Sequence, residues 1–287
     1  MTHFEQFYAD VPAEQRERLA AFRQTHPAQR ITLDGIPWEY IACGSGTSMI
    51  LWLVGGLRVA DAAYRSIPLM EDQFRIIAPT YPLLRSMNAL CDGLAALLDS
   101  QGVERAHILS GSFGGMVAQA FVRRHPSRVD RVVLSTTTVL DAQAVERYRQ
   151  QAAMIAAAPP ELALESSKAY FVQMIAPPDD ERAFWTAYVD ELFSERLNKD
   201  DLLSTVACML DFAEHVPLAP DDLVNWPGRM LIIESDDDAT FDADARARLR
   251  ALYPAARVHT FAAGGHSPAT TQRDAFFALV RQFFSEM

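Results

Sequence analysis

The stretch Ile108–Met116, which reads Ile-Leu-Ser-Gly-Ser-Phe-Gly-Gly-Met, joins an apolar segment directly to a predicted helix. Ser112 has a small residue two places before it, Ser110, and another two places after it, Gly114. A nucleophile on such a tight strand-to-helix turn has a strained backbone, and larger flanking side chains would collide with the neighbouring strand and helix. The pattern therefore predicts that the Ser112 hydroxyl stands above a sheet, at the positive end of a helix.

Strands and helices alternate on both sides of this stretch. Continuous apolar runs predict strands that are buried on both faces of a sheet. Alternation at this spacing predicts an α/β fold with a mostly parallel central sheet and helices on its two faces. The expected strands are residues 30–33, 38–42, 49–54, 75–79, 107–110, 131–134, 230–233 and 258–261, and the expected helices are residues 12–25, 60–70, 83–101, 115–125, 242–253 and 271–284.

The alternation stops between residues 140 and 228. This segment shows only helical patterns, interrupted by prolines, and it carries 16 acidic and 6 basic residues. We expect it to be a helical cap inserted into a core made of residues 1–139 and 229–287. The cap then holds a net charge of −10, which is nearly all of the chain's net charge of −11.

A serine nucleophile needs a base within hydrogen-bond reach and an acid that orients the base. On this type of fold the chain order is serine, acid, histidine. His266 follows the last predicted strand in a glycine-rich loop, so we expect it to be the base.

The acid should follow the strand at residues 230–233, where the chain reads Asp236-Asp237-Asp238. Such acids commonly stand three residues after the position that closes the strand. A strand that ends at Glu234 selects Asp237, and one that closes at Ser235 selects Asp238. A five-residue strand favours Asp237, with Asp238 as the alternative.

The oxyanion of an acyl-transfer reaction needs two N–H donors. One is expected from Phe113, the residue after the nucleophile. The other should follow the strand that ends at Val54, which selects Gly56 or, as the alternative, Leu57.

The glycine-rich turns do not match known cofactor loops. Gly44-Ser45-Gly46 lacks the third glycine of a dinucleotide-binding turn, and no Gly-Lys-Ser/Thr follows Gly55-Gly56. An EF-hand loop counted from Asp236 would need glycine and glutamate where the chain has Phe241 and Ala247. We therefore expect neither an organic cofactor nor a metal.

Charge narrows the possible partners. The chain of 287 residues has 26 basic and 37 acidic residues. Nucleic acid and anionic membranes select basic surfaces, so neither partner is expected. The sequence contains no apolar run of roughly 18 residues and no N-terminal signal peptide pattern. Three widely separated cysteines, Cys43, Cys91 and Cys208, suit a reducing cytoplasm.

These features together resemble the α/β-hydrolase superfamily over essentially the whole chain. Within it, the chain is similar to maspardin-like members. The stretches that carry this second resemblance are Arg75–Pro82, Cys91-Asp92-Gly93, Ser112–Gly115 with Ala118-Gln119, and Leu252-Tyr253-Pro254.

The resemblance also bears on the acid and on activity. In the maspardin-like pattern the acid lies 17 residues before the proline of Leu-Tyr-Pro, which here again selects Asp237. Maspardin itself resembles a binding protein without the catalytic histidine, whereas His266 is present here and favours an active enzyme. The chain departs from many hydrolases at Val54-Gly55, where they have His-Gly, and at Thr80, where they have Asp.

The predicted function is a serine hydrolase that cleaves a carboxylic ester or a similar small acyl substrate through an acyl-enzyme. Two alternatives remain: a triad enzyme that cleaves an amide, lactone, thioester or C–C bond, and a non-catalytic binding or scaffold protein. An acidic cap repels anions, so the substrate is expected to be neutral and moderately hydrophobic. Met154, Met174 and Met209 of the cap are candidates for lining its pocket.

Overall fold

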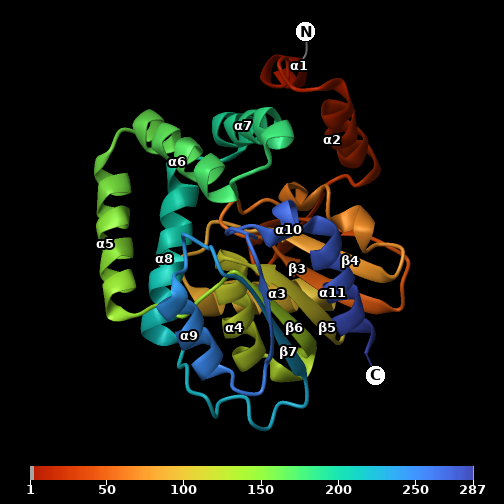
Figure 1. Cartoon of the computed structure of the whole chain (residues 1–287), viewed down its shortest axis with the longest axis vertical. Coiled ribbons are helices and arrows are strands. Elements are labelled where there is room, and N and C mark those ends of the chain that lie inside the picture. The colour runs from red at the N-terminus through yellow and green to blue at the C-terminus, as the bar shows by residue number, and fades with distance from the viewer. Residues whose placement is uncertain (1–2, 287) are drawn as a thin grey trace.

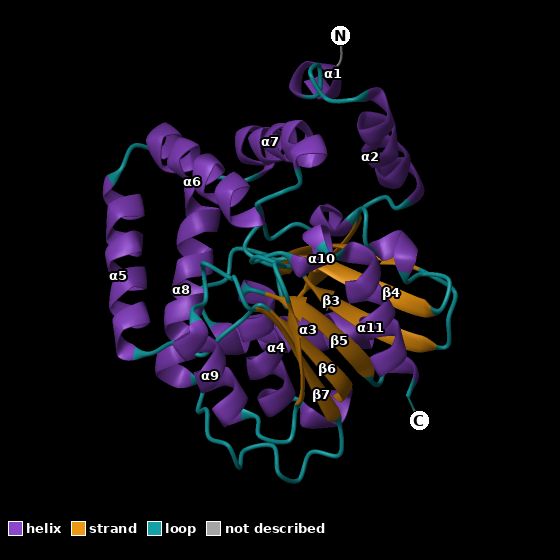
Figure 2. Cartoon of the chain, in the orientation of Figure 1, coloured by secondary structure: helices purple, strands orange, loops and turns teal. Residues whose placement is uncertain are grey.

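The computed structural model describes residues 3–286, and a sheet of eight strands lies at its centre (Figures 1 and 2). The strand order is β1-β2-β4-β3-β5-β6-β7-β8. β2 runs antiparallel to both of its neighbours, and the strands from β4 to β8 are parallel. The bounds are β1 Gln29–Leu33, β2 Ile36–Cys43, β3 Ser48–Leu53, β4 Phe74–Thr80, β5 Ala106–Gly111, β6 Val129–Ser135, β7 Arg229–Ser235 and β8 Arg257–Phe261.

Helices cover both faces of the sheet, as the alternation predicted (Figure 1). α3 (Met87–Ser100) and α4 (Phe113–Arg124) pack against each other on one face. α11 (Arg273–Ser285) packs on the other face, where Phe277 lies against Trp52 of β3. The remaining core helices are α9 (Ala243–Leu252) and the short α10 (Pro268–Thr271).

The prediction of one helix at residues 60–70 is wrong. The segment forms two short 3-10 helices instead, η1 (Ala60–Ala63) and η2 (Ile67–Leu69). Pro68 explains the break, because it has no N–H to donate and its ring would clash with the carbonyl of Tyr64 in a continuous helix. Another 3-10 turn, η3 (Pro126–Arg128), joins α4 to β6.

Four α-helices lie between β6 and β7: α5 (Ala142–Ala157), α6 (Pro160–Ile175), α7 (Arg182–Glu191) and α8 (Lys199–His215). The 3-10 turn η4 (Asp179–Glu181) precedes α7, and the π-helical turn η5 (Leu192–Arg196) follows it. α8 packs against α5 and α6 and also against α3 and α4 of the core. Residues 216–228 then return to the opposite end of the sheet, where Trp226 Nε1 donates to the carbonyl of Val129 at the start of β6.

Two N-terminal helices, α1 (His3–Phe7) and α2 (Ala13–Thr25), lie beside α7 (Figure 1). α2 ends at Thr25, so His26 lies outside the helix. This is expected because His26 precedes Pro27, and a residue before proline is disfavoured in the helical conformation. Tyr8 is fully buried, and its ring lies 5.9 Å from that of Phe184 in α7. The N-terminal helices therefore contact the inserted helices directly.

Candidate active site

Ser112 stands at the junction of β5 and α4 in a left-handed backbone conformation, with φ 51° and ψ −121°. This conformation is strained for a residue with a side chain and persists only where its surroundings hold it. The Ser112 N–H donates to Ser135 O at 3.0 Å, and its carbonyl accepts from Gly115 N–H at 2.9 Å and Thr137 Oγ1 at 2.8 Å.

The small residues around Ser112 are required by close packing. A Cβ atom on Gly114 would lie 2.2 Å from the carbonyl oxygen of Leu53, and one on Gly115 would lie 2.5 Å from Thr137 Cβ. Ser110 is buried, and its hydroxyl donates to Val133 O at 2.6 Å. The turn thus has the tight packing that the sequence pattern predicted.

His266 lies in the loop between β8 and α10, within hydrogen-bond reach of Ser112. The distance from His266 Nε2 to Ser112 Oγ is 3.1 Å. His266 Nδ1 lies 3.1 Å from each carboxylate oxygen of Asp238. Asp238 Oδ1 also accepts from the N–H groups of Thr240 and Phe241, so the carboxylate is held in place. Asp238 and His266 are both buried. The low dielectric of a protein interior strengthens the hydrogen bond between them.

The structure contradicts the expected contact between Asp237 and His266: the carboxylate beside the His266 ring is that of Asp238. Asp237 Oδ1 accepts from the N–H of Gly265 at 2.8 Å in an exposed position. β7 continues to Ser235, one residue beyond Glu234, and this places Asp238 and not Asp237 against the His266 ring. Asp236 also binds the histidine loop, through the N–H of Ala263.

Two backbone segments beside Ser112 offer free N–H groups. Phe113 is the first residue of α4, so its N–H has no partner within the helix. Within residues 3–286, Gly56 and Leu57 have no acceptor for their N–H groups. Gly56 lines both cavities that reach Ser112, whereas Leu57 lines only the larger one.

The larger cavity has a volume of about 190 Å³ and the smaller about 70 Å³. Trp185 and Ile175 of the inserted helices help to close the larger cavity, and Phe171 and Met209 help to close the smaller one. Within residues 3–286, no aspartate, glutamate, lysine or arginine lines either cavity.

A wider groove of about 690 Å³ opens beside His266, between α5, α6 and the start of α9. Met174 lines this groove and both smaller cavities, so it stands where the three spaces meet. Met209 lines one cavity, as the sequence suggested, but Met154 is 66% exposed and lines none of the three. The charged residues of the groove are Asp141, Arg147, Asp237, Asp242, Asp244 and Arg248.

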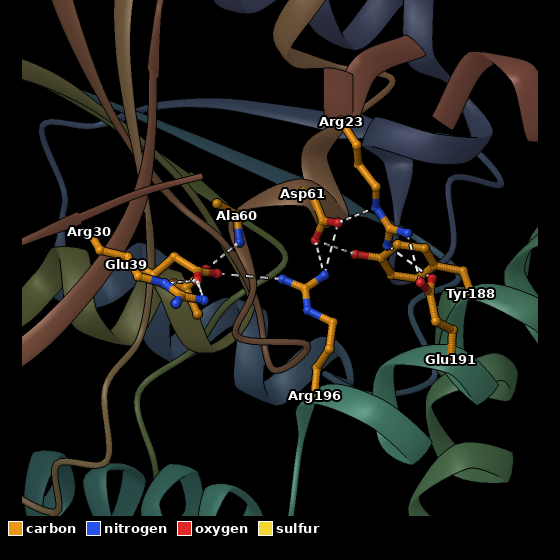
Figure 3. Close-up of polar contacts among 9 residues, drawn as sticks. Arg23, Arg30, Glu39, Ala60, Asp61, Tyr188, Glu191 and Arg196 are labelled. Atoms are coloured by element: carbon orange, nitrogen blue, oxygen red, sulfur yellow. Dashed lines mark hydrogen bonds and ion pairs between the residues drawn. The ribbon is translucent and has the colours of Figure 1, made fainter. Parts of the chain in front are cut away.

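A partly buried ion-pair cluster, with the buried Asp61 at its centre, joins the inserted helices to the core and to α2 (Figure 3). Asp61 of η1 accepts from Arg196 at 2.8 Å, from Arg23 at 2.9 Å and from the Tyr188 hydroxyl at 2.9 Å. Arg23 also binds both carboxylate oxygens of Glu191. Burial raises the pKa of Asp61, but Arg196 and Arg23 outweigh it and hold that pKa below its usual value. The carboxylate is therefore charged at neutral pH.

One group of three potential metal ligands occurs within residues 3–286, made of His26, Cys43 and Glu71. His26 Nε2 and Glu71 Oε2 lie 2.7 Å apart, within hydrogen-bond distance, and burial raises the Cys43 thiol pKa to about 12. None of the three lines the cavities at Ser112. Within the same residues, the helices are all too short or too polar to cross a bilayer.

Residues 65–270 match the family described as alpha/beta hydrolase fold. The 2-hydroxy-6-oxononadienedioate/2-hydroxy-6-oxononatrienedioate hydrolase 1 of Dechloromonas aromatica is 25% identical over 269 residues, which cover 86% of this chain and 90% of that protein. Maspardin of Danio rerio is 25% identical over 258 residues, with coverage of 86% and 79%. A hydrolase from Pseudomonas aeruginosa PA01 has a similar structure, with a TM-score of 0.76, 19% identity and coverage of 91% and 99%.

Proposed function

Because the chain belongs to the α/β-hydrolase fold family, we propose that it is a serine hydrolase that cleaves a carboxylic ester or a similar small acyl compound. The observation that carries this proposal is the continuous chain of contacts from Ser112 through His266 to Asp238. A hydroxyl, an imidazole and a carboxylate in this order activate a serine for attack on a carbonyl carbon.

The proposed reaction has two halves. Ser112 Oγ attacks the carbonyl carbon while His266 Nε2 takes its proton, and Asp238 stabilises the resulting imidazolium. The N–H groups of Gly56 and Phe113 stabilise the negative oxygen. His266 then gives the proton to the leaving oxygen, which departs as an alcohol and leaves an acyl-Ser112. In the second half, water attacks this ester, His266 takes and returns a proton, and the carboxylic acid is released.

We propose that the substrate is neutral and moderately hydrophobic. Among the described residues, no lysine or arginine that could pair with a substrate carboxylate lines the two cavities at Ser112. Four of the six charged residues along the adjoining groove are acidic. An unpaired carboxylate loses its hydration in such a site without gaining a partner, which opposes the binding of anions.

The segment of residues 140–228 is proposed to act as the cap that sets this selectivity. Its residues Phe171, Met174, Ile175 and Trp185 line the cavities at Ser112. A reducing compartment such as the cytoplasm is proposed as the location, because Cys43, Cys91 and Cys208 are all free.

A second candidate is cleavage of a C–C bond, favoured by the similarity to the Dechloromonas aromatica hydrolase. That protein is named for a dienedioate, a substrate with two carboxylates. The uncharged cavities at Ser112 favour the ester reading over this candidate. A purely binding role is opposed by the hydrogen bond between His266 and Ser112, which gives the serine a base.

A fluorophosphonate probe tests the proposal, because it reacts with activated serines. Wild type should be labelled and should hydrolyse p-nitrophenyl esters, and Ser112→Ala should do neither. Ser110→Ala is the matched control, since that buried hydroxyl only bonds to Val133 and should not be needed for labelling. A folded wild type that the probe does not label would overturn the proposal.

A further inference from the structure

Arg58 directly follows the loop that carries Gly56 and Leu57, yet its side chain reaches into the inserted helices. We propose that Arg58 is a positioning residue that couples this loop to helix α8. The proposal rests on the proposed function, because the loop matters to catalysis only if Gly56 binds an oxyanion there. It identifies the route by which the cap controls the reacting groups beneath it.

The backbone at Arg58 is strained. Its φ is 67°, in the left-handed region, and the N–H of Val59 donates across it to Leu57 O at 2.9 Å. A three-residue turn of this form is rare, and a residue other than glycine in such a conformation costs about 1–3 kcal/mol. The turn is closed on its other side by Arg58 N–H, which donates to Gly55 O at 3.0 Å. Contacts outside the loop must therefore hold it.

The guanidinium group supplies those contacts. The Arg58 side chain is only 2% exposed, and its Nη2 donates to the carbonyls of Tyr81 and Pro82 at 3.0 and 2.9 Å. Its Nη1 donates to Thr205 Oγ1 of α8 at 2.6 Å. Burial lowers the Arg58 pKa, and the carboxylate of Asp201, 3.6 Å away in α8, opposes this shift. Two of the groups that stabilise this buried cation thus belong to α8.

Tyr81 extends the connection to the second donor segment. Its N–H donates to Arg58 O at 3.0 Å, and its hydroxyl donates to Val54 O at 2.8 Å. Its ring meets the Phe113 ring edge-on, with the centroids 5.4 Å apart. The guanidinium of Arg58 therefore holds Tyr81. Tyr81 in turn contacts both ends of the loop that follows β3, at Val54 and Arg58, and also the first residue of α4.

A displacement of α8 removes the acceptor of Arg58 Nη1 and leaves a buried donor unpaired. The guanidinium must then move or admit water, which removes the support of the strained turn. The N–H of Gly56 changes its direction when the turn relaxes. A misplacement of about 1 Å can cost roughly 10²-fold in rate, so a small movement of α8 is sufficient to slow the reaction.

Two neighbouring residues of α8 provide the test. Thr205 also lines the smaller cavity at Ser112, whereas Ser204 lines neither cavity, so kcat has to be interpreted together with the glycine amide spectrum. Thr205→Val keeps the shape of the side chain but removes the acceptor for Arg58. Ser204→Ala removes a different bond between α8 and the core, the one from Ser204 Oγ to Leu84 O at 2.6 Å. Thr205→Val should lower kcat about 10-fold or more with KM nearly unchanged, and Arg58→Lys should lower it about 10²-fold. Ser204→Ala should stay within twofold of wild type.

A readout independent of turnover completes the experiment. Labelling with ¹⁵N-glycine limits the amide spectrum to the chain's 13 glycines. The resonances of Gly55 and Gly56 should shift in Thr205→Val and stay in place in Ser204→Ala. Unchanged resonances, or a change in KM alone, would overturn the coupling. A wild type without hydrolase activity would overturn the proposed function. The coupling between Arg58 and α8 would then be tested only by the amide resonances of Gly55 and Gly56.

Discussion

The His266 ring lies between Asp238 and Ser112, and its Nδ1 is 3.1 Å from both carboxylate oxygens of Asp238. Asp237 directly precedes Asp238 in the chain. The neighbouring carboxylate instead accepts from the backbone of Gly265. One aspartate can therefore orient the ring, and the other can only hold its loop.

This geometry predicts unequal effects for two conservative changes. Asp238→Asn should lower kcat by ~10²–10⁴-fold, because the imidazolium loses its charged partner and its ring loses its orientation. Asp237→Asn keeps an acceptor for Gly265 and should cost less than tenfold. Steady-state kinetics on a p-nitrophenyl ester compares the two, and a larger loss at Asp237 would refute the assignment.

The turn at Ser112 predicts that Gly114 tolerates no side chain. Gly114→Val should prevent folding or lower Tm steeply, because its Cβ would overlap the carbonyls of Leu53 and Val54. Gly111→Ala is the control, since a Cβ there meets nothing closer than Ser135 O at 3.8 Å. Thermal melts of both variants test this, and a Gly114→Val protein with wild-type Tm would show that the packing is wrong.

The ion-pair cluster predicts a large loss of stability when Asp61 loses its charge. Asp61→Asn leaves Arg23 and Arg196 without their shared carboxylate, and breaking a buried pair costs about 3–5 kcal/mol. Urea unfolding at pH 7 measures the loss. Glu14→Gln, which breaks the exposed pair with Arg18, should change stability by less than about 1 kcal/mol. Equal effects of the two changes would contradict the buried role of Asp61.

His107 predicts a loss of stability in acid. It is buried beside Phe284, with the ring centroids 4.8 Å apart, and burial lowers its pKa from 6.5 to about 4. The unfolded chain therefore binds the proton first, so stability falls as the pH falls from 6.5 to about 4. The loss is at most about 3 kcal/mol.

Two histidine variants separate the contribution of His107 to the loss of stability in acid from that of the other groups. His107→Phe should lose less stability than wild type between pH 7 and pH 4, as measured by urea unfolding. His3→Gln, at a position where the side chain is 74% exposed, should follow the wild-type curve. Parallel curves for wild type and His107→Phe would exclude His107 as the source.

The uncharged cavities predict discrimination between two succinate esters. The p-nitrophenyl ester of monomethyl succinate is neutral, and the mono-p-nitrophenyl ester of succinic acid carries a carboxylate of nearly the same shape. We expect kcat/KM to be at least about tenfold lower for the anion at low salt. The difference should shrink in 0.5 M NaCl if the acidic groove contributes, because salt screens it. Equal values at low salt would contradict the proposed preference.

The sequence was sufficient for most of the fold because the decisive signals are local. Apolar runs located the central strands, and the turn at Asp34-Gly35 located the first two. The resemblance to the α/β-hydrolase superfamily is confirmed, with maspardin among the relatives. The position of Ser112 followed from the spacing of Ser110 and Gly114, which reflects direct packing around one turn.

The choice between Asp237 and Asp238 could not be made by counting. It depends on where β7 ends, and that end is set by pairing with β8, in which Ser235 lies opposite Phe261. The role proposed for Arg58 was also out of reach, since its partner Thr205 is 147 residues away along the chain. Only the fold shows that the Arg58 side chain is buried, and burial is what distinguishes this arginine from those at the surface.

The path of helix α8 limits how the chain can be divided into modules. β6 and β7 are parallel neighbours, so the chain that leaves the end of β6 must cross to the start of β7. α8 makes most of that crossing while it packs against α3 and α4, and residues 216–228 complete it. The part of the proposed cap that does not make this crossing is therefore α5 to η5. We expect that a variant from which the proposed cap is removed or replaced keeps its fold only if α8 stays in place, because α8 connects β6 to β7.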